Sequence, residues 1–229
     1  VVVGSGVVGL FAHLFVQKYE APAYCGTFVG MATASVLSWG ELLAASVVAG
    51  VVFIAAQRAF NGFGGKLGTT AFVGCGVAVL ASGSGPDVVT TPDAGVVVGS
   101  LLTATAGAVA AYLLARLRGL GPVFGSSVVG ILAGGISLAV PGTTLLAAAA
   151  FCGSFTGMSH SGRLPSVASV GLAGVVTGLL FAAAVPVLAG FGGKLGTIAF
   201  VGCLVTHTLL AVAGGRLGVD KFGFQPLEG

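Results

Sequence analysis

The stretch GFGGKLGTTAFVGC (residues 62–75) returns later in the chain as GFGGKLGTIAFVGC (residues 190–203), with thirteen of fourteen residues unchanged. Each copy places one lysine, Lys66 or Lys194, between glycines and beside an apolar run. Glycine reaches backbone conformations that are closed to other residues, so the stretch is expected to break a helix. Inside a membrane, such a break is tolerated only where protein or a water-filled cavity surrounds it.

The composition predicts a membrane protein. Of the 229 residues, 56% are hydrophobic and 7% are charged, and the mean hydropathy is +1.10. A soluble domain carries about 25% charged residues, so this surface cannot face water everywhere. The net charge of +3 is small and spread along the chain, which excludes a basic nucleic-acid patch. The four cysteines lack the spacing of zinc ligands, and we expect neither a metal nor a cofactor.

Charged residues and glycine or proline clusters divide the chain into about nine apolar segments. A helix needs about 20 residues to cross a ~30 Å hydrocarbon core, and several segments are shorter, so we expect one or two re-entrant or broken helices. The predicted fold class is an all-α polytopic membrane protein with glycine-rich helix breaks. We place the spans at residues 2–16, 22–38, 42–60, 68–84, 94–116, 123–140, 143–159, 165–189 and 195–214.

The distribution of lysine and arginine predicts the orientation of these spans. With residue 1 outside, eight of the nine basic residues fall on the inner side, and Lys194 alone falls outside. We therefore expect an integral protein of the cell (inner) membrane with its C-terminus in the cytoplasm. The inner basic residues are Lys18, Arg58, Lys66, Arg116, Arg118, Arg163, Arg216 and Lys221.

Two more matches accompany the repeated stretch. VVGSGVVGL (residues 2–10) matches VFGSSVVGI (123–131), and YCGTFVGM (24–31) matches FCGSFTGM (151–158). The three offsets are 121, 127 and 128, as expected for a duplicated unit with small insertions. We predict a first repeat over 1–85, a connecting helix within 86–120, a second repeat over 121–215 and a cytoplasmic tail over 216–229. Four crossings and a connecting fifth turn the second repeat upside down, which is the pattern of inverted-repeat transporters and channels.

The repeated stretch also predicts an anion site. The residues after each lysine resume an apolar helix, and a helix N-terminus offers free N–H groups and a positive dipole end beside the ammonium. Thr69 and Thr197 can cap the helix or donate a hydroxyl to a solute. The alternative is a lysine that reaches the headgroups from a tight turn. The predicted substrate-binding residues are Gly64, Gly65, Lys66, Thr69, Gly192, Gly193, Lys194 and Thr197.

Further residues are candidates for lining a pathway. The four-residue glycine spacings, Gly26/Gly30 and Gly153/Gly157, favour close helix packing. Aromatic residues at matched positions are candidate constrictions, matched hydroxyls are candidate polar groups, and the cysteines are either thiols on the path or small buried side chains. A histidine inside the last span is either functional or a satisfied interhelical partner. These pathway candidates are Cys25, Thr27, Phe28, Cys152, Ser154, Phe155 and His207.

Together these features predict a channel or facilitative transporter for a small anion or anionic metabolite, with its pathway between the two repeats. Alternatives are a pathway for a neutral solute or a cation, and a membrane assembly subunit with a dry repeat interface. No spacing ties Ser127 or Ser161 to His160 or His207, so no enzyme is expected. The expected partners are the solute and the lipid bilayer, and a homo-oligomer is compatible with the sequence.

Overall fold

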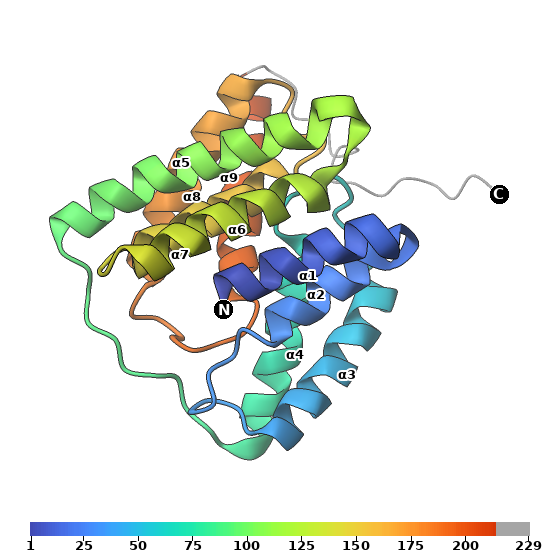
Figure 1. Cartoon of the computed structure of the whole chain (residues 1–229), viewed down its shortest axis with the longest axis vertical. Helices are drawn as coiled ribbons and strands as arrows, with labels where there is room; N and C mark the ends of the chain where they lie inside the picture. The colour runs from blue at the N-terminus through green and yellow to red at the C-terminus, as the bar shows by residue number, and fades with distance from the viewer. Residues whose placement is uncertain (214–229) are drawn as a thin grey trace.

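The computed structural model describes residues 1–213, apart from the side chain of residue 118, and the regular elements in this part of the chain are helices (Figure 1). The predicted tail over 216–229 lies outside the described residues. The α-helices are α1 (Val2–Phe15), α2 (Glu20–Val29), α3 (Trp39–Ala55), α4 (Lys66–Ser82), α5 (Ala94–Arg116), α6 (Pro122–Ala139), α7 (Thr144–Gly157), α8 (Val167–Ala184) and α9 (Lys194–Ala213). Two short 3-10 helices, η1 (Gln17–Tyr19) and η2 (Leu117–Gly119), precede α2 and α6.

Each predicted span holds one of these α-helices, and the segment predicted over 22–38 differs most from its helix. Helix α2 ends at Val29, and residues 30–38 form turns and bends before α3 begins. The chain leaves the helix because a tertiary contact holds it, in which the N–H of Thr33 donates to the carbonyl of Gly190 at 2.9 Å. Hydropathy does not reveal this bond, since both of its atoms belong to the backbone.

Four helices are long and apolar enough to cross a membrane by length and composition, namely α5, α6, α8 and α9. Helices α1, α3, α4 and α7 are also apolar but shorter. Large apolar side chains cover much of the outside, including Trp39 and Leu80, which are 84% and 85% exposed. An exposed apolar surface of this extent suits hydrocarbon better than water. The architecture is consistent with a helical membrane protein.

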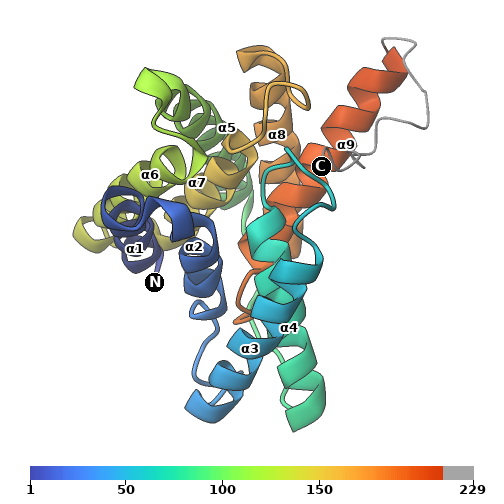
Figure 2. The ribbon, with the colours of Figure 1, turned by 90° about the vertical axis from the view of Figure 1, so that its right-hand side faces the viewer.

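Helices α4 and α9, which follow the two copies of the repeated stretch, meet near their N-termini and extend in opposite directions (Figures 1 and 2). Helix α3 packs along α4, and α8 packs along α9 in the same way. Helix α2 contacts α4, and α7 contacts α9. The centre of the molecule is therefore formed by the segments just before α4 and α9. We call residues 60–65 the first loop and residues 188–193 the second loop.

The predicted glycine contacts are confirmed for one pair and wrong for the other. A β-carbon on Gly153 would collide with the carbonyl oxygen of Ala104, and one on Gly157 would collide with that of Ala108, both on α5. By contrast, a β-carbon on Gly26 would meet nothing within 4 Å. The difference arises because α5 covers the helices of the second repeat, where it packs on α6, α7 and α8.

Candidate functional site

The two loops have matched backbones as well as matched sequences. Phe60 and Leu188 occupy corresponding positions, and their φ angles are +53° and +48°. The loops end at Gly65 and Gly193, where φ is +80° and +77°. Side chains rarely adopt these left-handed values, so glycine is required immediately before each helix starts. The repeated sequence thus specifies one turn, which is built twice.

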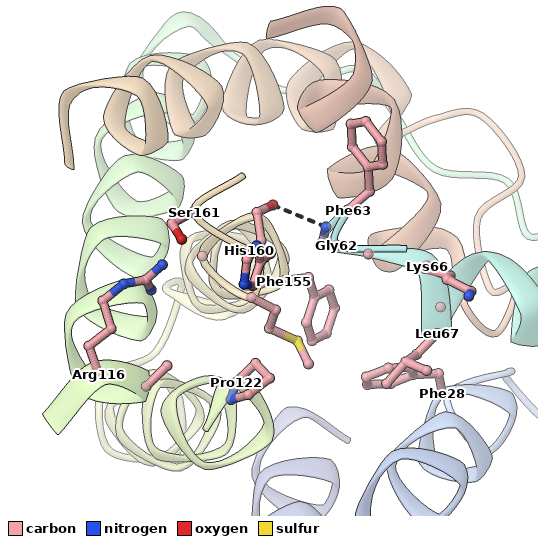
Figure 3. Close-up of a pocket in the computed structure, with 17 residues that line it drawn as sticks. Phe28, Gly62, Phe63, Lys66, Leu67, Arg116, Pro122, Phe155, His160 and Ser161 are labelled. Carbon is pink, nitrogen blue, oxygen red and sulfur yellow. Dashed lines mark hydrogen bonds between the residues drawn. The ribbon is translucent and has the colours of Figure 1, made fainter. Parts of the chain in front are cut away.

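Both lysines bind the end of the helix that precedes their loop. The ammonium of Lys66 donates to the carbonyl of Gln57 at 2.7 Å and to Oδ1 of Asn61 at 3.2 Å. Lys194 donates to the carbonyl of Val185 at 3.2 Å. These carbonyls lie just after α3 and α8, where a positive charge favours the negative end of the helix dipole. Figure 3 shows the Lys66 ammonium pointing away from Arg116 and His160.

The first turns of α4 and α9 touch each other through glycine. A β-carbon on Gly68 would lie 2.5 Å from the α-carbon of Gly196, and the reverse distance is also 2.5 Å. Hydrogen bonding along each helix starts only at Thr69 and Thr197, whose N–H groups donate to Gly65 and Gly193 at 3.1 Å. The N–H groups of residues 66–68 and 194–196 have no acceptor within residues 1–213. Three free donors and one positive helix end therefore lie at the start of each helix, beside the contact between Gly68 and Gly196.

A cavity opens beside each loop. The first cavity has a volume of about 550 Å³ and the second about 380 Å³. Corresponding residues line both, because Lys66, Leu67, Met158 and His160 in the first match Lys194, Leu195, Met31 and Thr33 in the second. The remaining walls differ, and those of the second cavity are mainly apolar. They include Val89, Leu145, Ala148, Phe181 and Val185.

Matched hydrogen bonds hold the two loops in place. The N–H of His160 donates to the carbonyl of Gly62 at 2.9 Å, which repeats the bond between Thr33 and Gly190. The thiol of Cys25 donates to the carbonyl of Leu67 at 3.2 Å. In the other copy, the thiol of Cys152 donates to Leu195 at 3.1 Å. The cysteines on α2 and α7 therefore secure the first turns of α4 and α9.

An aromatic cluster lies between the loops, formed by Tyr24, Phe28, Phe151 and Phe155. The rings of Phe28 and Phe155 are 4.8 Å apart, and their side chains are 2% and 1% exposed. Both of these rings line the first cavity. The cluster belongs to the same buried core as Phe181 and Phe191, which line the second cavity. Packed aromatic side chains thus separate the two cavities.

A chain of buried hydroxyl groups runs behind the aromatic rings. The hydroxyl of Tyr24 bonds with that of Ser126 at 2.9 Å, and Ser126 bonds with Ser154 at 2.8 Å. Ser154 also donates to the carbonyl of Phe151 at 2.6 Å. The hydroxyl of Thr27 is bound to the carbonyl of Tyr24 at 2.7 Å. These polar groups satisfy one another inside the protein.

The structure brings part of the predicted site together. Gly64, Gly65 and Lys66 line the first cavity, as do Phe28 and Phe155, while Gly193 and Lys194 line the second. The hydroxyls of Thr69 and Thr197 donate back into their own turns, to Gly65 and Gly193 at 3.3 Å. Gly192 is packed against the carbonyls of Phe28 and Val29. Cys25, Thr27, Cys152 and Ser154 line neither cavity.

His207 lines neither cavity, and its nearest link to one is Phe63, which lines the first. Its Nδ1 is 2.9 Å from the carbonyl oxygen of Arg163, and its ring is 5.2 Å from that of Phe63. The imidazole therefore links α9 to the segment after α7. One ring nitrogen of His207 thus has a backbone partner, and the ring has an aromatic neighbour.

Sequence reasoning missed three residues near the cavities. Arg116 lines the first cavity from the end of α5, and Ser159 accepts the N–H of Gly64 at 3.0 Å. Beside the second loop, the N–H of Asp87 donates to the carbonyl of Ala189 at 2.9 Å. The hydroxyls of Ser35 and Thr33 donate to this carboxylate at 2.7 and 2.8 Å, and they hold the pKa of Asp87 below its ordinary value. No repeated motif contains Arg116 or Asp87, so comparing the copies could not reveal them.

Residues 1–213 contain no group of three or more histidine, cysteine, aspartate or glutamate side chains that could hold a metal ion. No protein-family model, curated protein or solved structure matches the chain. Inferences about function therefore depend on the geometry of the two loops.

Proposed function

We propose that this protein is a membrane channel or facilitative transporter for a small anion or anionic metabolite, with its pathway between two inverted repeats. The observation that carries the proposal is the meeting of α4 and α9 at their N-termini. Each helix end is equivalent to about half a positive charge, and two such ends repel unless a negative charge lies near them. The three free N–H groups at each helix start are suitable donors for such a charge.

The opposite directions of α4 and α9 support the inversion of the second repeat. Matched backbone angles, lysine contacts and thiol contacts support the same relation between the copies. In an inverted-repeat transporter, the binding site lies at the repeat interface near the bilayer midplane. In the proposed orientation in the cell membrane, the first cavity opens to the cytoplasm and the second to the outside.

The charges near the loops favour an anion over a cation. The ammonium groups of Lys66 and Lys194 donate to carbonyl oxygens at the ends of the preceding helices. Each cavity is therefore lined by one lysine and one positive helix end. A cation entering either cavity meets repulsion that water screens poorly inside a protein.

The aromatic cluster forms the barrier in this conformation. Phe28 and Phe155 fill the space between the cavities, so a solute passes only when these rings move. In the proposed mechanism, the cluster opens toward one cavity at a time or briefly toward both. The first alternative describes a transporter and the second a channel.

Reconstitution into lipid vesicles tests the proposal. We expect the Lys66→Met, Lys194→Met double variant to remain folded but to lose its preference for anions over cations. Arg58→Met is the matched control, since it removes a basic residue that lines neither cavity. Unchanged selectivity in the double variant contradicts the proposed role of the lysines. Swelling of vesicles in a neutral solute favours the neutral pathway, and absence of all flux favours an assembly subunit.

A further inference from the structure

Among residues 1–213, the first cavity has a cationic side chain that has no counterpart in the second. Arg116 is the last residue of α5, and α5 lies between the repeats instead of within one. In the second cavity, the side chains of Val89, Phe181 and Val185 supply apolar walls. The repeated elements build two cavities, and α5 adds a fixed positive charge to only one of them.

The guanidinium of Arg116 is held in a defined plane. Its central carbon lies 3.2 Å from the ring centroid of Tyr112, and its Nη1 donates to the carbonyl of Tyr112 at 3.0 Å. The other donors, on Nε and Nη2, have no acceptor among residues 1–213. Figure 3 shows the guanidinium pointing toward Ser161 and His160 across the cavity. Two parallel N–H groups of one guanidinium match the geometry of a carboxylate, sulfate or phosphate.

The other lining groups complement this donor. Ser161 is exposed and offers a hydroxyl. Nδ1 of His160 accepts the N–H of Gly162, so Nε2 is the ring nitrogen that can bind a solute. Within residues 1–213, no aspartate or glutamate lines the first cavity. In this part of the chain, the cavity of about 550 Å³ therefore contains positive charge without a lining carboxylate to neutralise it.

We propose that the first cavity is a binding site for a small oxyanion, which Arg116 holds through two hydrogen bonds and Ser161 through a third. The site narrows the substrate class of the proposed function from small anions to oxyanions, and in this sense it rests on that function. Binding is one-sided, because the second cavity lacks the guanidinium. The shared chemistry is an oxygen-bearing anion, supplied either by a soluble ion or by a lipid phosphate.

Equilibrium binding of radiolabelled sulfate tests the site without requiring transport. The full chain is placed in nanodiscs of phosphatidylcholine, where we expect one saturable site. Arg116→Gln should weaken binding by about tenfold or more, because charge-assisted hydrogen bonds are lost. The affinity of Arg116→Lys for sulfate should lie between those of the unmodified protein and Arg116→Gln, since lysine keeps the charge but lacks the planar pair of donors. Arg58→Gln is the control and should bind sulfate like the unmodified protein.

A second pair of variants avoids the packing of Arg116 on Tyr112. Ser161→Glu places a carboxylate where the guanidinium can bind it, so sulfate binding should disappear. Ser161→Gln has a similar size without the charge and should retain binding within about tenfold. Wild-type binding in both Arg116→Gln and Ser161→Glu overturns the proposal, and so does the absence of saturable binding by the unmodified protein.

Adding phosphatidylglycerol at constant ionic strength distinguishes the two sources of oxyanion. Unchanged sulfate binding assigns the site to a soluble oxyanion, whereas competition by the lipid assigns it to a phosphate headgroup. Both results are consistent with the binding of an oxyanion by Arg116. Sulfate binding without any anion flux contradicts the proposed transport function alone, and anion flux without sulfate binding contradicts this site alone.

Discussion

The first and second loops share the residues GFGG and the same backbone turn, yet they lie in different surroundings. Gly68 and Gly196 contact each other reciprocally, and each lysine binds the end of the preceding helix. Beyond these shared contacts, the first loop faces Arg116 on α5, and the second faces Asp87 in the connection before α5. The repeated stretch therefore determines the local geometry, whereas segments present once determine which charges each cavity receives.

Replacing the central aromatic rings tests whether the two copies are energetically equivalent. Phe28→Ala and Phe155→Ala should each lower the free energy of unfolding by about 4 kcal/mol, because each removes a buried ring and leaves a cavity. Phe11→Ala is the control, since Phe11 is 57% exposed on α1. Unfolding of the purified protein in mixed detergent micelles measures the change. A loss below about 1 kcal/mol for either central ring contradicts the observed packing.

Adding a methyl group to either central glycine should break the contact between the copies. Gly68→Ala and Gly196→Ala each push a β-carbon against the backbone of the other helix. We expect the free energy of unfolding to fall by about 3 kcal/mol in each variant. Gly76→Ala is a matched control on α4, because its β-carbon meets nothing within 4 Å. The control should be neutral or more stable by up to about 1 kcal/mol. Equal stability of Gly68→Ala and Gly76→Ala rules out the close approach of α4 and α9.

The sequence predicted much of this central arrangement. Hydropathy located the helices because long apolar runs separate at glycines, prolines and charges, and the repeat predicted that Lys66 and Lys194 lie at matched helix starts. It could not predict the backbone bond that ends α2 at Val29 or the open space at Gly26. Both depend on which helices pack together in three dimensions. Arg116 was missed for the same reason, since its place beside the first loop follows from the packing of α5.

The lysines should differ in how strongly they support their loops. Lys66 donates to two oxygens and Lys194 to one. We therefore expect the free energy of unfolding to fall by about 2 kcal/mol in Lys66→Met and by about 1 kcal/mol in Lys194→Met. Lys18→Met is the control, because Lys18 is exposed on the surface. Unfolding of the purified variants in mixed detergent micelles measures both changes. A larger loss at Lys194 than at Lys66 reverses the expected order and contradicts the comparison of acceptors.

The smallest effect is expected at the second loop, where Asp87 binds Thr33 and Ser35. Because hydrogen bonding lowers the pKa of Asp87 in the folded protein, its contribution is present above the ordinary aspartate pKa and is lost as the pH falls through the lowered value. The protection factors of the amides in residues 83–93, which correct for the intrinsic slowing of exchange in acid, should therefore fall as the pH is lowered. Asp87→Asn should show the lowered protection factors already at neutral pH, while the protection factors of the first loop stay unchanged. Equal exchange in Asp87→Asn and the unmodified protein contradicts this role.

The most direct test of the central claim is the reversal potential of the unmodified protein in vesicles across a gradient of potassium salt. Two helix N-termini that meet at the pathway should favour the anion and disfavour potassium. We predict a potential whose sign corresponds to anion permeation. A potential of the opposite sign, with potassium as the permeating ion, contradicts the account.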